Sequence, residues 1–137
     1  MILRILIFVT ILSFSACNRT IDPVTCTEEF VVINLTVIDN EGLVADSVNI
    51  LVYNKGDNTI YDLTGMNDPD NPMTQRGEYT IFHDGFLKQV QGKIERLVVE
   101  GEKGLFSFMA EFDVGGNECH VYKISGPDIV TLEKRQN

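Results

Sequence analysis

The chain has 137 residues, a length that suits one domain and excludes most multi-domain enzymes. Its 20 acidic and 11 basic side chains give a formal net charge of −9, which argues against a nucleic-acid partner because such a partner requires a basic surface. Hydrophobic residues make up 44% of the chain, but 12 of them lie in the first 16 residues, so the N-terminus must be interpreted first.

Residues 1–16 have the pattern of a cleaved export signal. One basic residue, Arg4, precedes an apolar run that is shorter than the roughly 20 residues of a membrane-spanning helix. Residues 14–17 (FSAC) then place two small residues directly before a cysteine. This stretch resembles the lipobox of bacterial lipoprotein signal peptides, with phenylalanine where leucine is usual. The resemblance implies cleavage before Cys17 and acylation of its thiol and of the new N-terminus.

Acylation of Cys17 would anchor the protein to the bacterial cell envelope, because each buried lipid CH₂ contributes about 0.8 kcal/mol. Asn18 stands where some inner-membrane lipoproteins carry a retention aspartate, which favours the outer membrane. The alternative is an ordinary secreted protein in which Cys17 is a free or paired thiol.

Two further cysteines, Cys26 and Cys119, form an even pair once Cys17 is assigned to the lipid. In an oxidising compartment we expect them to form a disulfide, which closes a loop of about 90 residues and stabilises the fold by roughly 4 to 5 kcal/mol. Two buried free thiols, or a metal pair with His120, fit less well, because adjacent residues of a strand face opposite sides.

After a polar tether at residues 17–28, the folded domain is expected at 29–137. Its apolar residues alternate with polar ones and are interrupted by Gly, Asn, Asp and Pro, which predicts an all-β antiparallel sandwich of about seven strands. No stretch has sustained helical spacing, and Gly92 argues against a short helix between Phe86 and Ile94. The expected strands lie at 30–39, 47–53, 59–63, 77–82, 96–100, 105–114, 118–124 and 129–132.

Two of these stretches carry a family resemblance. Residues 37–50 (VIDNEGLVADSVNI) combine a strand, an Asp-x-x-Gly turn and a second strand, and residues 77–81 (GEYTI) begin a later one. They resemble carboxypeptidase-regulatory-like, transthyretin-like domains. The resemblance implies a prealbumin-like sandwich without catalytic residues that serves as a stability, spacing or binding module.

The irregular segment at 64–76 is the first candidate for an interaction surface, because long loops in small domains are often functional. Its candidate residues are Asn67, Asp68, Asp70 and Asn71, whose oxygens also suit calcium. The segment lacks EF-hand spacing, so a solvated turn is the simpler interpretation.

Catalytic and metal motifs are missing from the sequence. His83 and His120 have no third zinc ligand at a suitable spacing, and no nucleophile elbow, Walker loop or zincin motif occurs. We therefore expect no metal, no cofactor and no enzymatic activity; a small hydrolase is the weakest alternative.

The sequence thus favours a non-enzymatic, lipid-anchored envelope lipoprotein that acts as a binding or structural accessory. Its expected partners are the membrane, through the lipid, and a protein or glycan. The alternative is a glycan-binding accessory lipoprotein of a nutrient-uptake system, which requires exposed aromatic platforms. The candidate platforms are Tyr53, Tyr61, Tyr79 and Tyr122.

Overall fold

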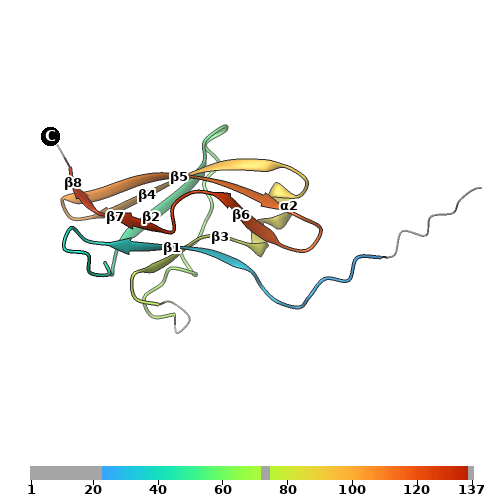
Figure 1. Ribbon diagram of the computed structural model, residues 1–137, viewed down its shortest axis with the longest axis horizontal. Coiled ribbons are helices and arrows are strands. Elements are labelled where there is room, and N and C mark those ends of the chain that lie inside the picture. The colour runs from blue at the N-terminus through green and yellow to red at the C-terminus, as the bar shows by residue number, and fades with distance from the viewer. Residues whose placement is uncertain (1–22, 72–74, 136–137) are drawn as a thin grey trace, which may run out of the picture.

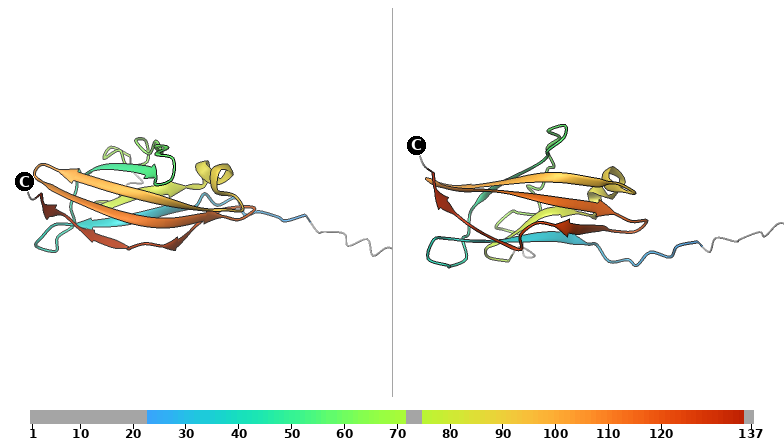
Figure 2. Two further views of the ribbon diagram at one scale, coloured as in Figure 1. Left: turned by 90° about the horizontal axis from the view of Figure 1, so that it is seen from above. Right: turned by 45° about the horizontal axis from the view of Figure 1, so that its top comes forward.

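Two β-sheets lie face to face in the computed structural model, which describes residues 23–71 and 75–135 (Figures 1 and 2). This architecture confirms the prediction of an all-β sandwich. The first sheet has the order β3-β1-β7, with β1 at Val32–Ile38, β3 at Glu78–His83 and β7 at Ile129–Thr131. The second has the order β2-β4-β5-β6, with β2 at Asn49–Asn54, β4 at Ile94–Lys103, β5 at Phe106–Gly116, β6 at Val121–Ser125, and β8 at Glu133–Lys134 pairing with β5.

The core lies between the sheets and follows from the period-2 pattern of the strands. In β1 the alternate residues Ile33, Leu35 and Val37 are buried. In the second sheet Leu97 of β4 pairs with Phe112 of β5, and neither side chain is exposed. Burial of such side chains contributes roughly 1.5 to 3 kcal/mol each, so this layer is the main source of stability.

One strand pair departs from the predicted antiparallel arrangement. β7 runs parallel to β1, with Thr36 opposite Ile129 and Ile38 opposite Thr131. The chain reaches β7 from β6 in the other sheet rather than through a hairpin from β1, and such a crossover permits a parallel neighbour. The prediction of a purely antiparallel sandwich is therefore wrong for this pair.

The structure forms no strand at 59–63, where one was predicted. Ile60 forms only an isolated bridge with Tyr53. The Asp62 side chain accepts the N–H of Thr64 at 3.1 Å, and such local side-chain bonds compete with a strand ladder.

A short helix occurs where the sequence argued against one. A 3₁₀ turn, η1 (Asp84–Phe86), leads into the helix α2 (Leu87–Val90). The His83 side chain caps η1 by accepting the N–H of Gly85 at 3.0 Å. Gly92 lies just beyond the helix with φ +72°, so it follows the end of the helix instead of preventing it.

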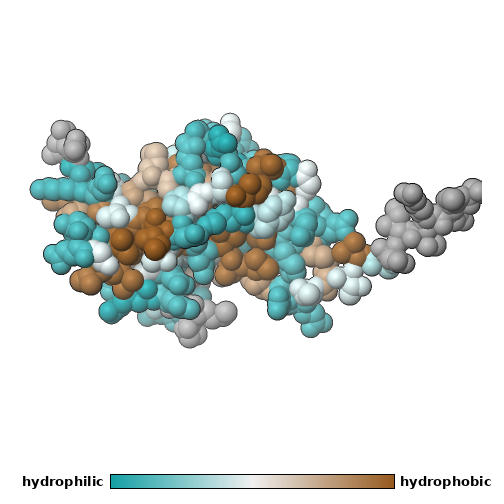
Figure 3. Space-filling model, viewed as in Figure 1, coloured by the Kyte–Doolittle hydropathy of each residue, from teal (hydrophilic) through white to brown (hydrophobic). Residues whose placement is uncertain are grey.

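The two ends of the sandwich differ. The N-terminal segment leaves at the end that carries α2 and β6, whereas the C-terminus lies at the opposite end (Figure 1). Hydrophobic side chains are exposed among hydrophilic ones on the face drawn in Figure 3.

Candidate functional site

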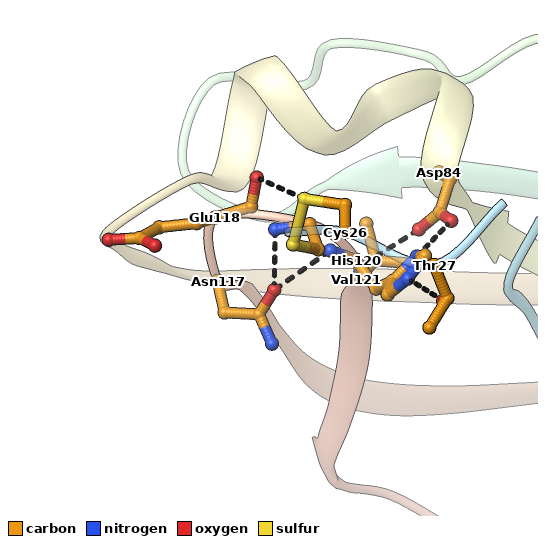
Figure 4. Close-up of a disulfide and its surroundings, with 8 residues drawn as sticks. Cys26, Thr27, Asp84, Asn117, Glu118, His120 and Val121 are labelled. Carbon is orange, nitrogen blue, oxygen red and sulfur yellow. Dashed lines mark hydrogen bonds and ion pairs between the residues drawn. A yellow bond between two sulfur atoms is a disulfide. The ribbon is translucent and has the colours of Figure 1, made fainter. Parts of the chain in front are cut away.

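A disulfide fastens the N-terminal segment to the sandwich (Figure 4). Cys26 and Cys119 are 93 residues apart in the sequence, and their Cα atoms are 5.3 Å apart. This bond confirms the predicted pairing. Cys26 is exposed, and Cys119 is half-buried. The N-terminal segment is thus fixed at one end of the domain.

Asn117 shapes the turn that presents Cys119. Its Oδ1 accepts the backbone N–H groups of Cys119 and His120, both at 2.8 Å, and its own N–H donates to the carbonyl of His120 at 3.0 Å. This Asn-centred turn explains why β6 begins at Val121 and not at the predicted Glu118.

Asp84 lies at the centre of a hydrogen-bond network beside the disulfide. Its Oδ2 accepts the N–H of Val31 at 2.9 Å, and its Oδ1 accepts the N–H of Val121 at 2.8 Å. In return, the Asp84 N–H donates to the Val31 carbonyl at 3.0 Å. One carboxylate therefore ties the N-terminal segment, η1 and β6 together.

His120 extends this network to the exposed segment. Its Nδ1 lies 2.7 Å from Asp84 Oδ2, and its Nε2 lies 2.9 Å from Thr27 Oγ1 (Figure 4). Burial raises the pKa of Asp84, but hydrogen bonds from Val31, His120 and Val121 outweigh it and hold that pKa below its ordinary value. The carboxylate is therefore ionised at neutral pH, which favours the hydrogen-bonded arrangement.

Thr27, His120 and Asp84 stand in the order hydroxyl, imidazole, carboxylate, which is also the order of a hydrolytic triad. The sequence did not predict this series of hydrogen bonds, because Thr27 lies 93 residues from His120, and His120 lies 36 residues from Asp84. Neither Thr27 nor His120 lines any of five cavities of about 410 to 460 Å³ on the described part of the chain. The hydrogen bonds of Thr27, His120 and Asp84, together with the disulfide, form a clamp that holds the N-terminal segment against the sandwich.

His83 belongs to an aromatic cluster at the same end. Its ring stacks on Phe86 at a centroid distance of 4.5 Å and lies 5.4 Å from the ring of Phe30. Burial lowers the pKa of His83, despite the opposing effect of Asp84. In the described residues no group of three or more His, Cys, Asp or Glu side chains is arranged to hold a metal ion.

Comparison with known proteins adds nothing to this geometry. No protein-family model, curated protein or solved structure matches the chain. Cys17 lies outside the described residues, and among those described no helix has the length and apolar character needed to span a membrane.

The predicted interaction loop is organised by its own polar side chains. Asn67 pairs through its carboxamide with the backbone of Thr80 in β3. Asp68 Oδ1 accepts the N–H of Asp70 at 2.9 Å, and Asn71 Nδ2 donates to the Gly65 carbonyl at 3.1 Å. The four predicted residues thus lie in one loop, and Asn67 is committed to the fold.

The tyrosines differ in their availability to a ligand. Tyr61 and Tyr79 are each only 5% exposed, which removes them as sugar platforms. Tyr53 is half-buried and donates its hydroxyl to Glu100 at 2.8 Å. Tyr122 is 45% exposed, so it is the best remaining candidate among the four.

Proposed function

We propose that the protein is a lipid-anchored accessory of the bacterial outer membrane that binds or supports a partner without catalysing a reaction. In this proposal residues 1–16 are removed, Cys17 carries the lipid, residues 17–28 form the tether, and residues 29–137 form the sandwich. The disulfide is the observation that carries the proposal furthest. Such bonds persist in oxidising compartments, so it supports export.

In this proposal the position of the clamp determines which end of the sandwich faces the membrane. Cys26 follows Cys17 by nine residues, which span at most about 30 Å when fully extended. A lipid on Cys17 would therefore hold the end that carries α2 and β6 near the bilayer. The opposite end would then be presented away from the membrane.

The transthyretin-like assignment of the sandwich is part of the same proposal. Gly42 has φ +82° and donates its N–H to the Asp39 carbonyl at 3.1 Å, and Asp39 Oδ1 accepts the N–H of Leu43 at 2.9 Å. Gly77 is the glycine of the Gly-x-Tyr motif and lies directly before β3, and it also has a positive φ of 77°. Both glycines occupy backbone positions that other residues rarely adopt, which supports the motif.

Membrane fractionation tests the anchor. Cys17→Ala should move the protein from the membrane fraction to the soluble fraction. The matched control is the double variant Cys26→Ala and Cys119→Ala, which removes two cysteines but should leave the protein on the membrane. If Cys17→Ala stays membrane-bound, the lipid anchor is wrong.

Tyr122 supports the second candidate, a glycan-binding accessory of a nutrient-uptake system. Its exposed ring lies against Gly115, where an added Cβ would come within 2.9 Å of it. Gly115 has no side chain, so the end of the Tyr122 ring can lie close to the backbone of β5. Binding on a sugar array that is lost in Tyr122→Ala and kept in Tyr53→Ala would favour this candidate.

A further inference from the structure

A groove of about 460 Å³ lies between β2 and the irregular segment that follows it. Two apolar side chains line it and are exposed: Leu51 of β2 at 42% and Ile60 at 65%. Val48, Asn67 and Pro69 also line it. The groove therefore combines accessible apolar surface with the edge of a sheet.

The edge of β2 is only half covered by the protein's own chain. The N–H of Tyr61 donates to the Val52 carbonyl at 2.9 Å, and the N–H of Asn54 donates to the Thr59 carbonyl at 2.8 Å. Backbone groups two residues apart in a strand point to the same side, so those of Ile50 also point away from β4. No described residue hydrogen-bonds to them. The groove thus contains a short stretch of open strand edge.

The charge of the groove is one-sided. Asp62 and Asp68 line it, and the lining residues include no lysine or arginine. A hydrogen bond from the Thr64 N–H holds the pKa of Asp62 below its ordinary value, so this carboxylate is ionised at neutral pH. A second copy of the chain that docked through the same groove would place Asp62 and Asp68 against their own equivalents, which is repulsive. A basic occupant is favoured instead.

We propose that this groove binds an extended segment of a partner protein, with alternating basic and apolar side chains, as an added strand on β2. Its backbone would pair with Ile50, its apolar side chains would contact Leu51 and Ile60, and its basic side chains would face Asp62 and Asp68. Main-chain hydrogen bonds supply affinity in this mode, and the side-chain contacts supply specificity. The inference rests on the binding role proposed above and gives that role a partner class.

Peptide selection tests the groove directly. The full chain, purified in detergent, is panned against a phage-displayed library of random peptides. We expect the enriched peptides to alternate lysine or arginine with apolar residues. Their affinity should fall about tenfold or more in Ile60→Lys and in Asp62→Lys, equivalent to about 1.4 kcal/mol.

Ile94→Lys is the matched control, because Ile94 is 66% exposed against 65% for Ile60 and lies outside the groove. It should leave peptide affinity unchanged, and added peptide should slow hydrogen exchange at the Ile50 amide. Failure to enrich any peptide, enrichment of acidic peptides, equal loss in Ile94→Lys, or binding of a glycan lost in Ile60→Lys would each overturn the inference. Binding in detergent does not depend on acylation, so this test and the Cys17→Ala test fail separately.

Discussion

The Asn67 side chain pairs with the backbone of Thr80 in both directions. Asn67 Nδ2 donates to the Thr80 carbonyl at 2.9 Å, and the Thr80 N–H donates to Asn67 Oδ1 at 2.7 Å. The carboxamide therefore occupies the position that the peptide group of a neighbouring strand would take on β3. Exposed strand edges pair readily with other chains, so this side chain also protects the edge.

Asn67→Ala should destabilise the fold by about 1 to 3 kcal/mol, because Thr80 is only 8% exposed and both of its backbone groups would lose a partner. Urea unfolding followed by circular dichroism measures the change. The control is Asn40→Ala at an exposed turn, which should change the free energy of unfolding by less than about 0.5 kcal/mol. Equal stability of the two variants would contradict the role of Asn67.

Loss of the disulfide should have a larger effect. The double variant Cys26→Ser and Cys119→Ser should lose roughly 3 to 5 kcal/mol, because the bond closes a loop across 93 residues of sequence. The N-terminal segment should also become more sensitive to protease. Mass spectrometry without reductant should show the two cysteines linked, and two free thiols in the mature protein would refute the bond.

Stability should fall in acid because of Asp84. Folding lowers the pKa of this carboxyl, so its stabilising effect is complete above the unfolded value of about 4 and is lost as the pH falls through the folded value. Asp84→Asn should cost about 1 to 3 kcal/mol at pH 7 and should reduce the loss of stability below pH 4. Thermal unfolding of both proteins, compared at neutral pH and at acidic pH below the unfolded pKa, measures the difference. An unchanged acid slope in Asp84→Asn would contradict the assignment.

Thr27 and His120 should act on stability and not on catalysis. Thr27→Ala should cost about 1 kcal/mol through loss of the bond to His120 Nε2. Hydrolysis of a p-nitrophenyl ester should equal that of an unrelated control protein, and Thr27→Ala should not change it. A rate above the control that disappears in both Thr27→Ala and His120→Ala would identify a hydrolase and reverse the proposed function.

The sequence predicts those features that depend on neighbouring residues. Alternation places Leu35 and Val37 on one face of a strand, and both are buried. Once Cys17 is assigned to the lipid, the cysteine count leaves Cys26 and Cys119 as a pair, and these two are bonded. The sequence-based prediction fails where local hydrogen bonds compete with the expected secondary structure. Asp62 binds the following backbone in place of a strand ladder, and Gly92 follows a short helix.

By itself, therefore, the sequence determined the class of fold and the partner of each cysteine in the described chain, because alternation and cysteine count are local or compositional properties. Only the tertiary structure decided which strands are neighbours, including the parallel pair β1 and β7. It also brought Thr27, Asp84 and His120 together from three distant segments. Contacts between distant segments depend on how the two sheets pack, and a local sequence pattern does not predict that packing.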